Sequence, residues 1–256
     1  MSFEIVELNK PELKNPILIE GLPGIGNVGK IAMDFMIETL KAKRFIEIYS
    51  KAFPNSVFVN EKNLVHLPRV SLYYKKIKNQ DVIFLGGDVQ PLDETACYEF
   101  CDIILGLFKK YDGKEIVTMG GIGMPKIPKS PIVYCTANNY NIIKKYKTRE
   151  LNENIFGVVG PIIGVTGLLV GLSGKKNIPS IALLAQTFGH PNYLGIKGAN
   201  EILKVLNKKL NLGLNLNLLE KEIKDIEREV RIKTATPIPK IRTIEPEFKD
   251  KTSYIG

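Results

Sequence analysis

Glycines in a fixed spacing are the first residues of this chain that could do chemistry. Gly24, Gly26 and Gly29 form a G-x-G-x-x-G pattern between an apolar strand and a helix. In such a pattern the backbone can approach a phosphate at the helix N-terminus. The acidic residue that would hold a ribose is missing near position 50, and Ile31 stands where a phosphate loop needs a magnesium-binding hydroxyl. We therefore favour tight strand-helix packing over nucleotide binding, and we expect no cofactor.

Two later loops place further glycines and a histidine after strands. Gly121 and Gly123 follow a strand expected at 115–119, and His190 follows one expected at 178–184. Because loops of this kind gather on one face of an α/β sheet, the sequence predicts a candidate ligand-binding face. Its members are Gly24, Gly26, Gly29, Gly121, Gly123 and His190. For His190 a catalytic or ligand-binding role stays open beside a capping or turn role, which we favour.

Acidic residues and cysteines give two weaker signals for a metal or an acid-base pair. Asp88, Asp93 and Glu94 follow an expected strand and could hold a cation, but residues of this type also cap a helix N-terminus. Cys97 and Cys101 lie four apart on that helix, without a second ligand pair nearby. We favour helix capping for the acids and burial for the thiols. We therefore expect no metal site, no catalytic residues and no enzyme.

Charge and hydropathy exclude several classes of partner. The chain has 256 residues, with 36 basic and 27 acidic side chains and a formal net charge of +9, and its lysines are spread in short pairs. A solvated surface fits this pattern better than nucleic-acid binding. Residues 155–174 are uncharged and long enough to span a bilayer, but they contain six glycines and Pro161. We expect a glycine-rich turn and an internal helix there, no membrane contact, and, because no secretion signal opens the sequence, the cytoplasm.

Alternation of apolar runs predicts an α/β core followed by two appendages. Expected strands lie at 16–20, 44–49, 56–60, 65–74, 81–85, 115–119 and 178–184, and expected helices lie at about 28–40, 93–110, 198–211 and 216–232. Strands that repeatedly end in glycine loops before helices indicate an α/β sheet with a loop-lined face. Three prolines among charged residues argue against a packed core after the last helix. The predicted divisions are an α/β core domain at 1–215, an amphipathic helix at 216–235 and a flexible, proline-containing C-terminal tail at 236–256.

Three glycine motifs, taken in order, resemble the family of the proteasome assembly chaperone second subunit and its archaeal homologues. The motifs are Ile-Glu-Gly-Leu-Pro-Gly-Ile-Gly-Asn-Val-Gly at 19–29, Gly-Gly-Ile-Gly at 120–123 and Gly-Pro-Ile-Ile-Gly-Val-Thr-Gly-Leu-Leu at 160–169. The resemblance spans about 10–235. It implies a three-layer α/β sandwich with a central mixed sheet, similar to the phosphorylase/hydrolase-like class, and no demonstrated catalytic constellation.

The resemblance also implies a function and a contact site. Family members bind proteasome α-subunits and assist ring assembly, and several insert a C-terminal hydrophobic-tyrosine-any motif between neighbouring α-subunits. This sequence ends Ser-Tyr-Ile-Gly, so Tyr254 is third from the end and not penultimate. We expect Tyr254, Ile255 and Gly256 to bind the partner, with self-association into a homo-oligomer adding avidity. A small-molecule or nucleotide-binding α/β enzyme that uses the glycine-rich face, and a purely structural oligomer, remain as alternatives.

Overall fold

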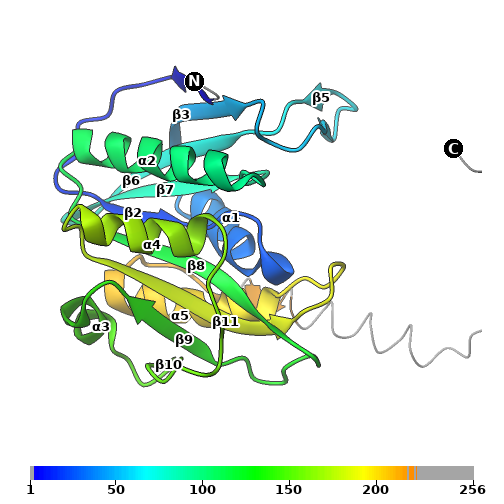
Figure 1. Ribbon diagram of the computed structural model, residues 1–256, viewed down its shortest axis with the longest axis vertical. Helices are drawn as coiled ribbons and strands as arrows, with labels where there is room; N and C mark the ends of the chain where they lie inside the picture. Colours follow the sequence, from blue (N-terminus) through cyan, green and yellow to red (C-terminus); the bar gives the residue numbers. More distant parts are fainter. Residues whose placement is uncertain (1–2, 218, 222, 224–256) are drawn as a thin grey trace, which may run out of the picture.

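The computed structural model describes residues 3–217, 219–221 and 223. Figure 1 shows how strands and helices alternate along this part of the chain. The strands are β1 (Phe3–Glu7), β2 (Ile17–Glu20), β3 (Lys43–Ser50), β4 (Phe58–Val59), β5 (Val65–His66), β6 (Val70–Ile77), β7 (Gln80–Gly87), β8 (Glu115–Met124), β9 (Val133–Ala137), β10 (Leu151–Asn152) and β11 (Ser180–Phe188). The helices are α1 (Val28–Thr39), α2 (Glu94–Lys110), α3 (Tyr140–Tyr146), α4 (Val165–Lys175) and α5 (Ile196–Leu210), and a 3-10 turn, η1 (Ile25–Asn27), precedes α1.

One mixed sheet of nine strands forms the middle layer, in the order β1-β3-β6-β7-β2-β8-β11-β9-β10. The four central strands, β7, β2, β8 and β11, run parallel to one another. Antiparallel strands β6, β3 and β1 extend one side, and β9 pairs antiparallel with β11 on the other. Helix α2 carries the chain from β7 across to β8, on the far side of β2. In an open α/β sheet such a reversal opens a crevice at the carboxyl ends of the strands.

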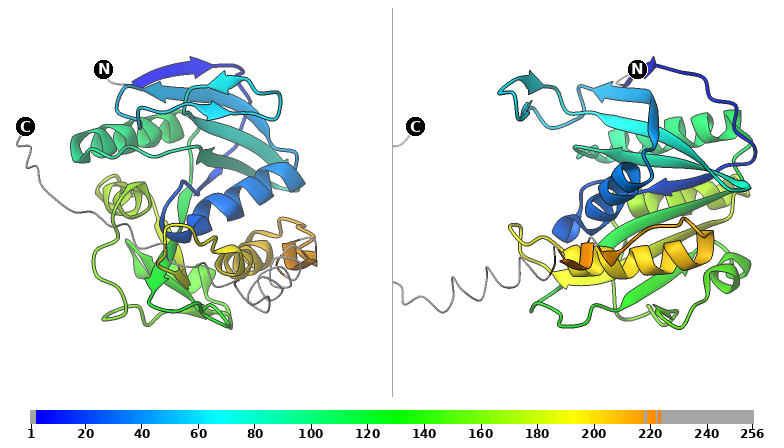
Figure 2. Two further views of the ribbon diagram at one scale, coloured as in Figure 1. Left: turned by 90° about the vertical axis from the view of Figure 1, so that its right-hand side faces the viewer. Right: turned by 180° about the vertical axis from the view of Figure 1, so that it is seen from behind.

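Helices cover both faces of this sheet. Helices α2 and α4 lie on one face and α1 and α5 on the other, which the side view in Figure 2 shows as three layers. Alternating side chains of the short strand β2 serve both faces: Ile17 and Ile19 belong to the core under α1 and α5, and Leu18 belongs to the core under α2 and α4. The predicted α/β sandwich with a central mixed sheet is confirmed.

Several expected elements are confirmed, and others are corrected. The strand, glycine loop and helix predicted from residue 16 to about residue 40 are present, and α2 and α5 begin and end within two residues of their predicted bounds. The single strand expected at 65–74 is wrong, because the chain breaks between β5 and β6 at Pro68, which has no N–H to donate to a ladder. Sequence analysis also missed β1, β9, β10 and α3.

The loop expected after residue 119 is wrong, because β8 continues to Met124 and pairs with β11 from Ile116 to Met124. Its glycines let another piece of backbone approach the strand. A Cβ at Gly121 would overlap the carbonyl oxygen of Ile25, and a Cβ at Gly29 would overlap the carbonyl oxygen of Met119. These two contacts hold the start of α1 directly against β8.

The apolar stretch at 155–174 forms an irregular segment followed by α4, whose Leu169 and Val165 are buried under the sheet. Within the part of the chain that the structure describes, no helix combines the length and the apolar character that a membrane span needs. The described residues of the expected helix at 216–232 include Leu219, which is buried in the core beneath α1 and α5. The rest of that helix, from residue 224, lies outside the described residues.

Substitution of Gly121 by alanine tests the backbone contact between β8 and the 24–29 loop. The added methyl group would force the Ile25 carbonyl away from the strand, and we expect Gly121→Ala to lower the free energy of unfolding by about 2 kcal/mol. Chemical denaturation of the purified variant measures this change. Gly171→Ala is the matched control, because Gly171 lies on α4 with nothing within 4 Å of an added Cβ. The control should gain up to about 1 kcal/mol from better helix propensity; equal stability of the two variants would contradict the predicted overlap.

Candidate functional site

A cavity of about 590 Å³ lies where strands β2 and β8 end. Its walls come from the loop at 22–25, from β8 at 119–123 and from the segment at 158–163, together with Gly29, Gln90, Thr166 and Leu184. The cavity therefore occupies the crevice that the reversal of strand order creates. Apart from glycine and apolar side chains, the walls hold two polar side chains, Gln90 and Thr166.

The structure brings four of the six candidate ligand residues together at this cavity and leaves two outside it. Gly24, Gly29, Gly121 and Gly123 line the walls, whereas Gly26 and His190 do not. Gly26 adopts a φ of 61° within η1, which favours glycine. These glycines therefore contribute flat walls and close backbone packing.

His190 belongs to a turn after β11. Its ring stacks on Phe188 with the centroids 5.7 Å apart, and its Nδ1 accepts a hydrogen bond of 3.2 Å from the backbone N–H of Asn192. The carbonyl of His190 also accepts from the backbone N–H of Tyr193. These contacts fit the turn-forming role that sequence analysis favoured for this residue.

Sequence analysis missed Glu20, the last residue of β2, which lies beneath the cavity. Its side chain is completely buried and points to the face covered by α2 and α4. Oε1 accepts a hydrogen bond of 2.9 Å from the backbone N–H of Leu22, and Oε2 accepts one of 3.2 Å from the Thr166 hydroxyl. Desolvation raises the pKa of Glu20 to about 7, although these hydrogen bonds and one to the Met119 backbone act to lower it. A charged residue that ends an apolar strand was the signal that could have found it.

Thr166 connects Glu20 to the cavity. It lies in the first turn of α4 and lines the cavity wall, and its hydroxyl lies 3.2 Å from Glu20 Oε2 and 3.4 Å from the Met119 carbonyl oxygen. One hydroxyl proton serves both acceptors, so the protonation state of Glu20 decides which acceptor the proton faces. The polar floor of the cavity is therefore a carboxyl-hydroxyl pair.

Gln90 fixes the rim of the cavity. Its Nε2 donates to the carbonyl of Pro23 at 2.7 Å, and its Oε1 accepts from the backbone N–H of Val165 at 3.1 Å. A Cβ at Gly164, which has a φ of 85°, would lie 2.7 Å from that same Oε1. The amide thus joins the loop after β2 to the N-terminus of α4 and holds the cavity open in one shape.

The cysteines on α2 lie near Glu20 and inside the core. Cys97 and Cys101 are both buried and free, and a hydrogen bond from the Cys101 thiol lowers the pKa of Cys97 and raises that of Cys101. Cys135 is buried under the other face, where desolvation raises its pKa to about 11. Among the described residues, no group of three or more acidic, histidine or cysteine side chains is arranged to hold a metal ion.

The acidic residues after β7 make backbone contacts. Asp93 is the N-cap of α2 and accepts from the backbone N–H of Ala96 at 2.9 Å, and Asp88 accepts from the backbone N–H of Arg69 at 3.3 Å. Glu94 lies exposed in the first turn of the helix. These contacts fit the capping interpretation. Asp93, Asp88 and Glu94 each have a different environment and do not form one site.

A second surface lies at the antiparallel side of the sheet. The segment at 57–67 between β3 and β6, which includes the β4-β5 hairpin and is called the hairpin arm here, extends away from the body in Figure 1. Val59, Leu64, Val65 and Leu67 each expose at least 60% of their surface. An apolar arm of this kind is typical of a protein-protein contact.

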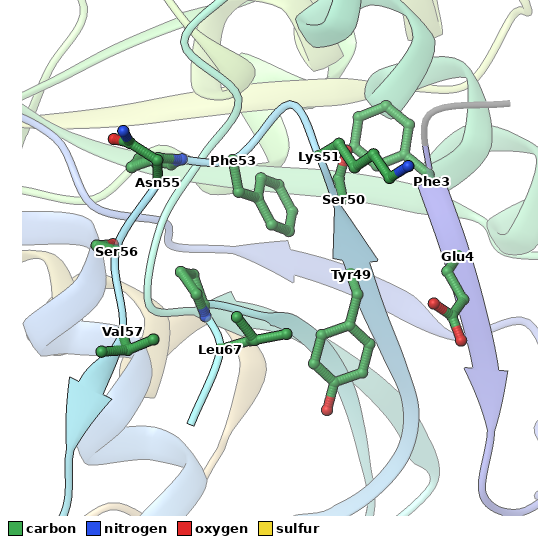
Figure 3. Close-up of a pocket in the computed structure, with 12 residues that line it drawn as sticks. Phe3, Glu4, Tyr49, Ser50, Lys51, Phe53, Asn55, Ser56, Val57 and Leu67 are labelled. Atoms are coloured by element: carbon green, nitrogen blue, oxygen red, sulfur yellow. The ribbon is translucent and has the colours of Figure 1, made fainter. Parts of the chain in front are cut away.

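A groove of about 990 Å³ runs beside the base of the hairpin arm. Figure 3 shows Phe53, Tyr49 and Leu67 around it, with Phe3 of the edge strand β1 behind. The Phe3 and Phe53 rings pack edge to face with centroids 6.0 Å apart, which makes the floor rigid and apolar. The expected partner-binding residues Tyr254, Ile255 and Gly256 lie outside the described residues.

The raised pKa of Glu20 predicts a stability that depends on pH. In the unfolded chain this carboxyl ionises near 4.5, and in the folded protein it ionises near 7. Below pH 4.5 both states hold the proton. Between pH 4.5 and pH 7 the unfolded chain releases it while the folded protein keeps it, so the folded state loses stability as the pH rises. Above pH 7 both states are ionised and the loss is complete. Glu20→Gln keeps the shape without this charge. Between pH 4.5 and pH 7.5 we expect the wild type to lose about 3 kcal/mol of unfolding free energy relative to this variant.

Urea denaturation of the two proteins at half-unit pH intervals measures this difference. Because the two proteins share all other titrating groups, the difference between their curves of unfolding free energy against pH measures the ionisation of Glu20. Parallel curves across the interval would show that Glu20 ionises in the folded protein as it does in water.

Comparison with known proteins places this chain in a family. A family model described as the PAC2 family matches residues 18–232. An uncharacterized protein of Methanocaldococcus jannaschii is 35% identical over 236 residues, which cover 90% of this chain and 90% of that protein. Most of the described fold and the whole cavity lie within the matched region.

Two solved structures from Pyrococcus furiosus share the fold and between a quarter and a third of the aligned residues. PbaB, an archaeal proteasome activator, has a TM-score of 0.84 and 32% identity, with 91% of this chain and 99% of that chain covered. PbaA, an archaeal homolog of a proteasome-assembly chaperone, has a TM-score of 0.76 and 25% identity, with 91% of this chain and 92% of that chain covered. The resemblance inferred from the three glycine motifs is confirmed, and the chain belongs to the PAC2 family.

Proposed function

We propose that this protein binds proteasome α-subunits as a homo-oligomer and acts as an assembly chaperone or activator of the proteasome. The observation that carries this proposal is the likeness to PbaB, an archaeal proteasome activator, over nearly the full length of both chains. The likeness to PbaA, a homolog of a proteasome-assembly chaperone, supports the same class of partner. The proposal assigns the protein a binding role and no catalytic one.

The C-terminal residues are the proposed contact with the α-subunits. Tyr254 offers an aromatic ring with a polar end, and Ile255 beside it offers an apolar side chain. A contact of three residues is weak when it is made once. Several copies carried by one oligomer raise its effective affinity, because each later contact forms within the same complex.

The hairpin arm is the proposed surface for self-association. Its exposed valines and leucines gain from burial, and the groove beside its base offers an apolar surface. Both features lie on the antiparallel side of the sheet, away from the cavity at the carboxyl ends of β2 and β8. Contact between copies through the arm would leave the cavity outside the interface.

Removal of the terminal tyrosine ring tests the contact with α-subunits. We expect Tyr254→Ala, like deletion of residues 237–256, to abolish co-sedimentation with purified proteasome α-subunit rings. Each contact would lose the tyrosine side chain that is proposed to insert between neighbouring α-subunits. Analytical ultracentrifugation at physiological salt measures the bound fraction. Phe248→Ala is the matched control, because it removes a different aromatic ring from the same tail and should leave binding unchanged. Full binding by the deleted protein would move the contact to the folded body.

Charge placed on the hairpin arm tests self-association. We expect the double variant Val59→Asp, Val65→Asp to lower the oligomer mass to that of the monomer, because two carboxylates would have to be buried without partners. Size-exclusion chromatography with light scattering measures this mass. Ile127→Asp is the control, since Ile127 is also an exposed apolar residue but lies after β8. An unchanged mass in the arm variant would exclude the arm from the interface.

A further inference from the structure

The cavity at the carboxyl ends of β2 and β8 supports an inference that is independent of the proposed proteasome role. Its volume of about 590 Å³ lies within the range of small-molecule sites. Gln90 already uses both ends of its amide to hold the rim. The Thr166 hydroxyl is therefore the side-chain group that a ligand in the cavity would meet.

Glycine makes two of the walls flat. A Cβ at Gly24 or at Gly160 would meet nothing within 4 Å, so both positions face open space and not another part of the chain. The remaining walls carry proline, isoleucine, leucine and valine side chains. Apolar walls without projections at two glycines fit a planar ring better than a branched or bulky molecule.

Charge excludes the anionic ligands that glycine loops often hold. None of the described residues that line the cavity is a lysine or an arginine. A phosphate or carboxylate placed there would lose its hydration without a counter-charge, which is strongly unfavourable. With Glu20 protonated the cavity offers no counter-charge to a cation either, so this state of the cavity fits an uncharged molecule.

The pair formed by Glu20 and Thr166 decides which hydrogen-bonding group that molecule must carry. When Glu20 holds its proton, its O–H donates to Thr166 Oγ1, and the Thr166 proton turns away from the carboxyl toward the Met119 carbonyl or a ligand. When Glu20 is ionised, it attracts the Thr166 proton to itself. The groups that face Glu20 from the neighbouring elements are Cys97 and Cys101 on α2, Thr166 on α4 and the Met119 backbone on β8.

We propose that this cavity binds an uncharged, planar molecule with one carbonyl, which accepts a hydrogen bond from the Thr166 hydroxyl while Glu20 behind it holds a proton. Thr166 contacts the ligand, and Glu20 acts through Thr166 as a positioning residue. The raised pKa of Glu20 keeps the protonated form populated near neutral pH. Binding is therefore linked to proton retention and weakens as the pH rises.

The neutral fluorophore Prodan, a planar naphthalene with one ketone, is the probe. We expect its emission to shift to the blue when it enters the cavity of the full-length protein, and a titration then measures its dissociation constant. Gly24→Leu and Gly160→Leu should each abolish this binding, because both glycines line the cavity and neither has a neighbour within 4 Å that would keep a leucine side chain out of it. Gly171→Leu is the matched control, since Gly171 is equally open but does not line the cavity.

Thr166→Val and Glu20→Gln separate the hydrogen bond from the shape of the cavity. Loss of the hydroxyl in Thr166→Val should lower the affinity for Prodan about fivefold. Between pH 6 and pH 8.5 the affinity of the wild type for Prodan should fall up to about fivefold, as in Thr166→Val, whereas Glu20→Gln, whose amide always donates to Thr166, should bind equally at both values. Native circular dichroism confirms that each variant is folded.

Three results would overturn this proposal. Prodan binding to both leucine variants with wild-type affinity would place the probe elsewhere, for example in the groove beside the hairpin arm. Unchanged affinity in Thr166→Val would remove the carbonyl contact. A wild-type affinity as independent of pH as that of Glu20→Gln would remove the role of Glu20.

Discussion

The backbone contact between β8 and the loop at 24–29 is the constraint on which the centre of this protein depends. At Gly121 and Gly29 a carbonyl oxygen of the facing segment occupies the place that a Cβ would need. Because both partners are backbone atoms, neither can move aside as a flexible side chain would. The contact therefore fixes the distance between α1 and the central sheet, and it fixes the position of the turn that leaves β2. The walls of the cavity follow from that position.

The same turn allows an acid to lie in the core. Glu20 ends β2 with no exposed surface, which is unfavourable for a carboxylate unless donors face it. The turn supplies the N–H of Leu22 to one oxygen, and the start of α4 supplies the Thr166 hydroxyl to the other. Shifted pKa values of this kind gather at functional sites more often than in ordinary cores. Here the buried carboxyl of Glu20 lies directly under the cavity.

Much of the fold could be predicted from residue patterns, because strongly apolar strands and amphipathic helices can be recognised from short stretches of sequence. The strand at 16–20, the helix α2 with its Asp93 cap and the family relationship all followed from the sequence. The extension of β8 through Gly120 and Gly121 did not, since glycine usually marks a loop and only the distant Ile25 carbonyl explains its presence in a strand. Glu20 was missed for a related reason: its partner Thr166 is 146 residues away. Contacts between distant segments decide the role of both residues, and no local pattern records them.

The arrangement of strands separates the two surfaces of this PAC2 protein. Parallel strands need crossover helices, so the carboxyl ends of β2 and β8 are enclosed by loops and α4, and a preformed cavity results. Antiparallel strands β3 and β6 are joined without a crossover helix, so the connection between them can lengthen into the hairpin arm without disturbing the centre. The cavity and the groove beside the arm share no lining residue. Substitutions in one should therefore add independently to substitutions in the other, and a partner held by the arm leaves the chemistry of Glu20 and Thr166 intact.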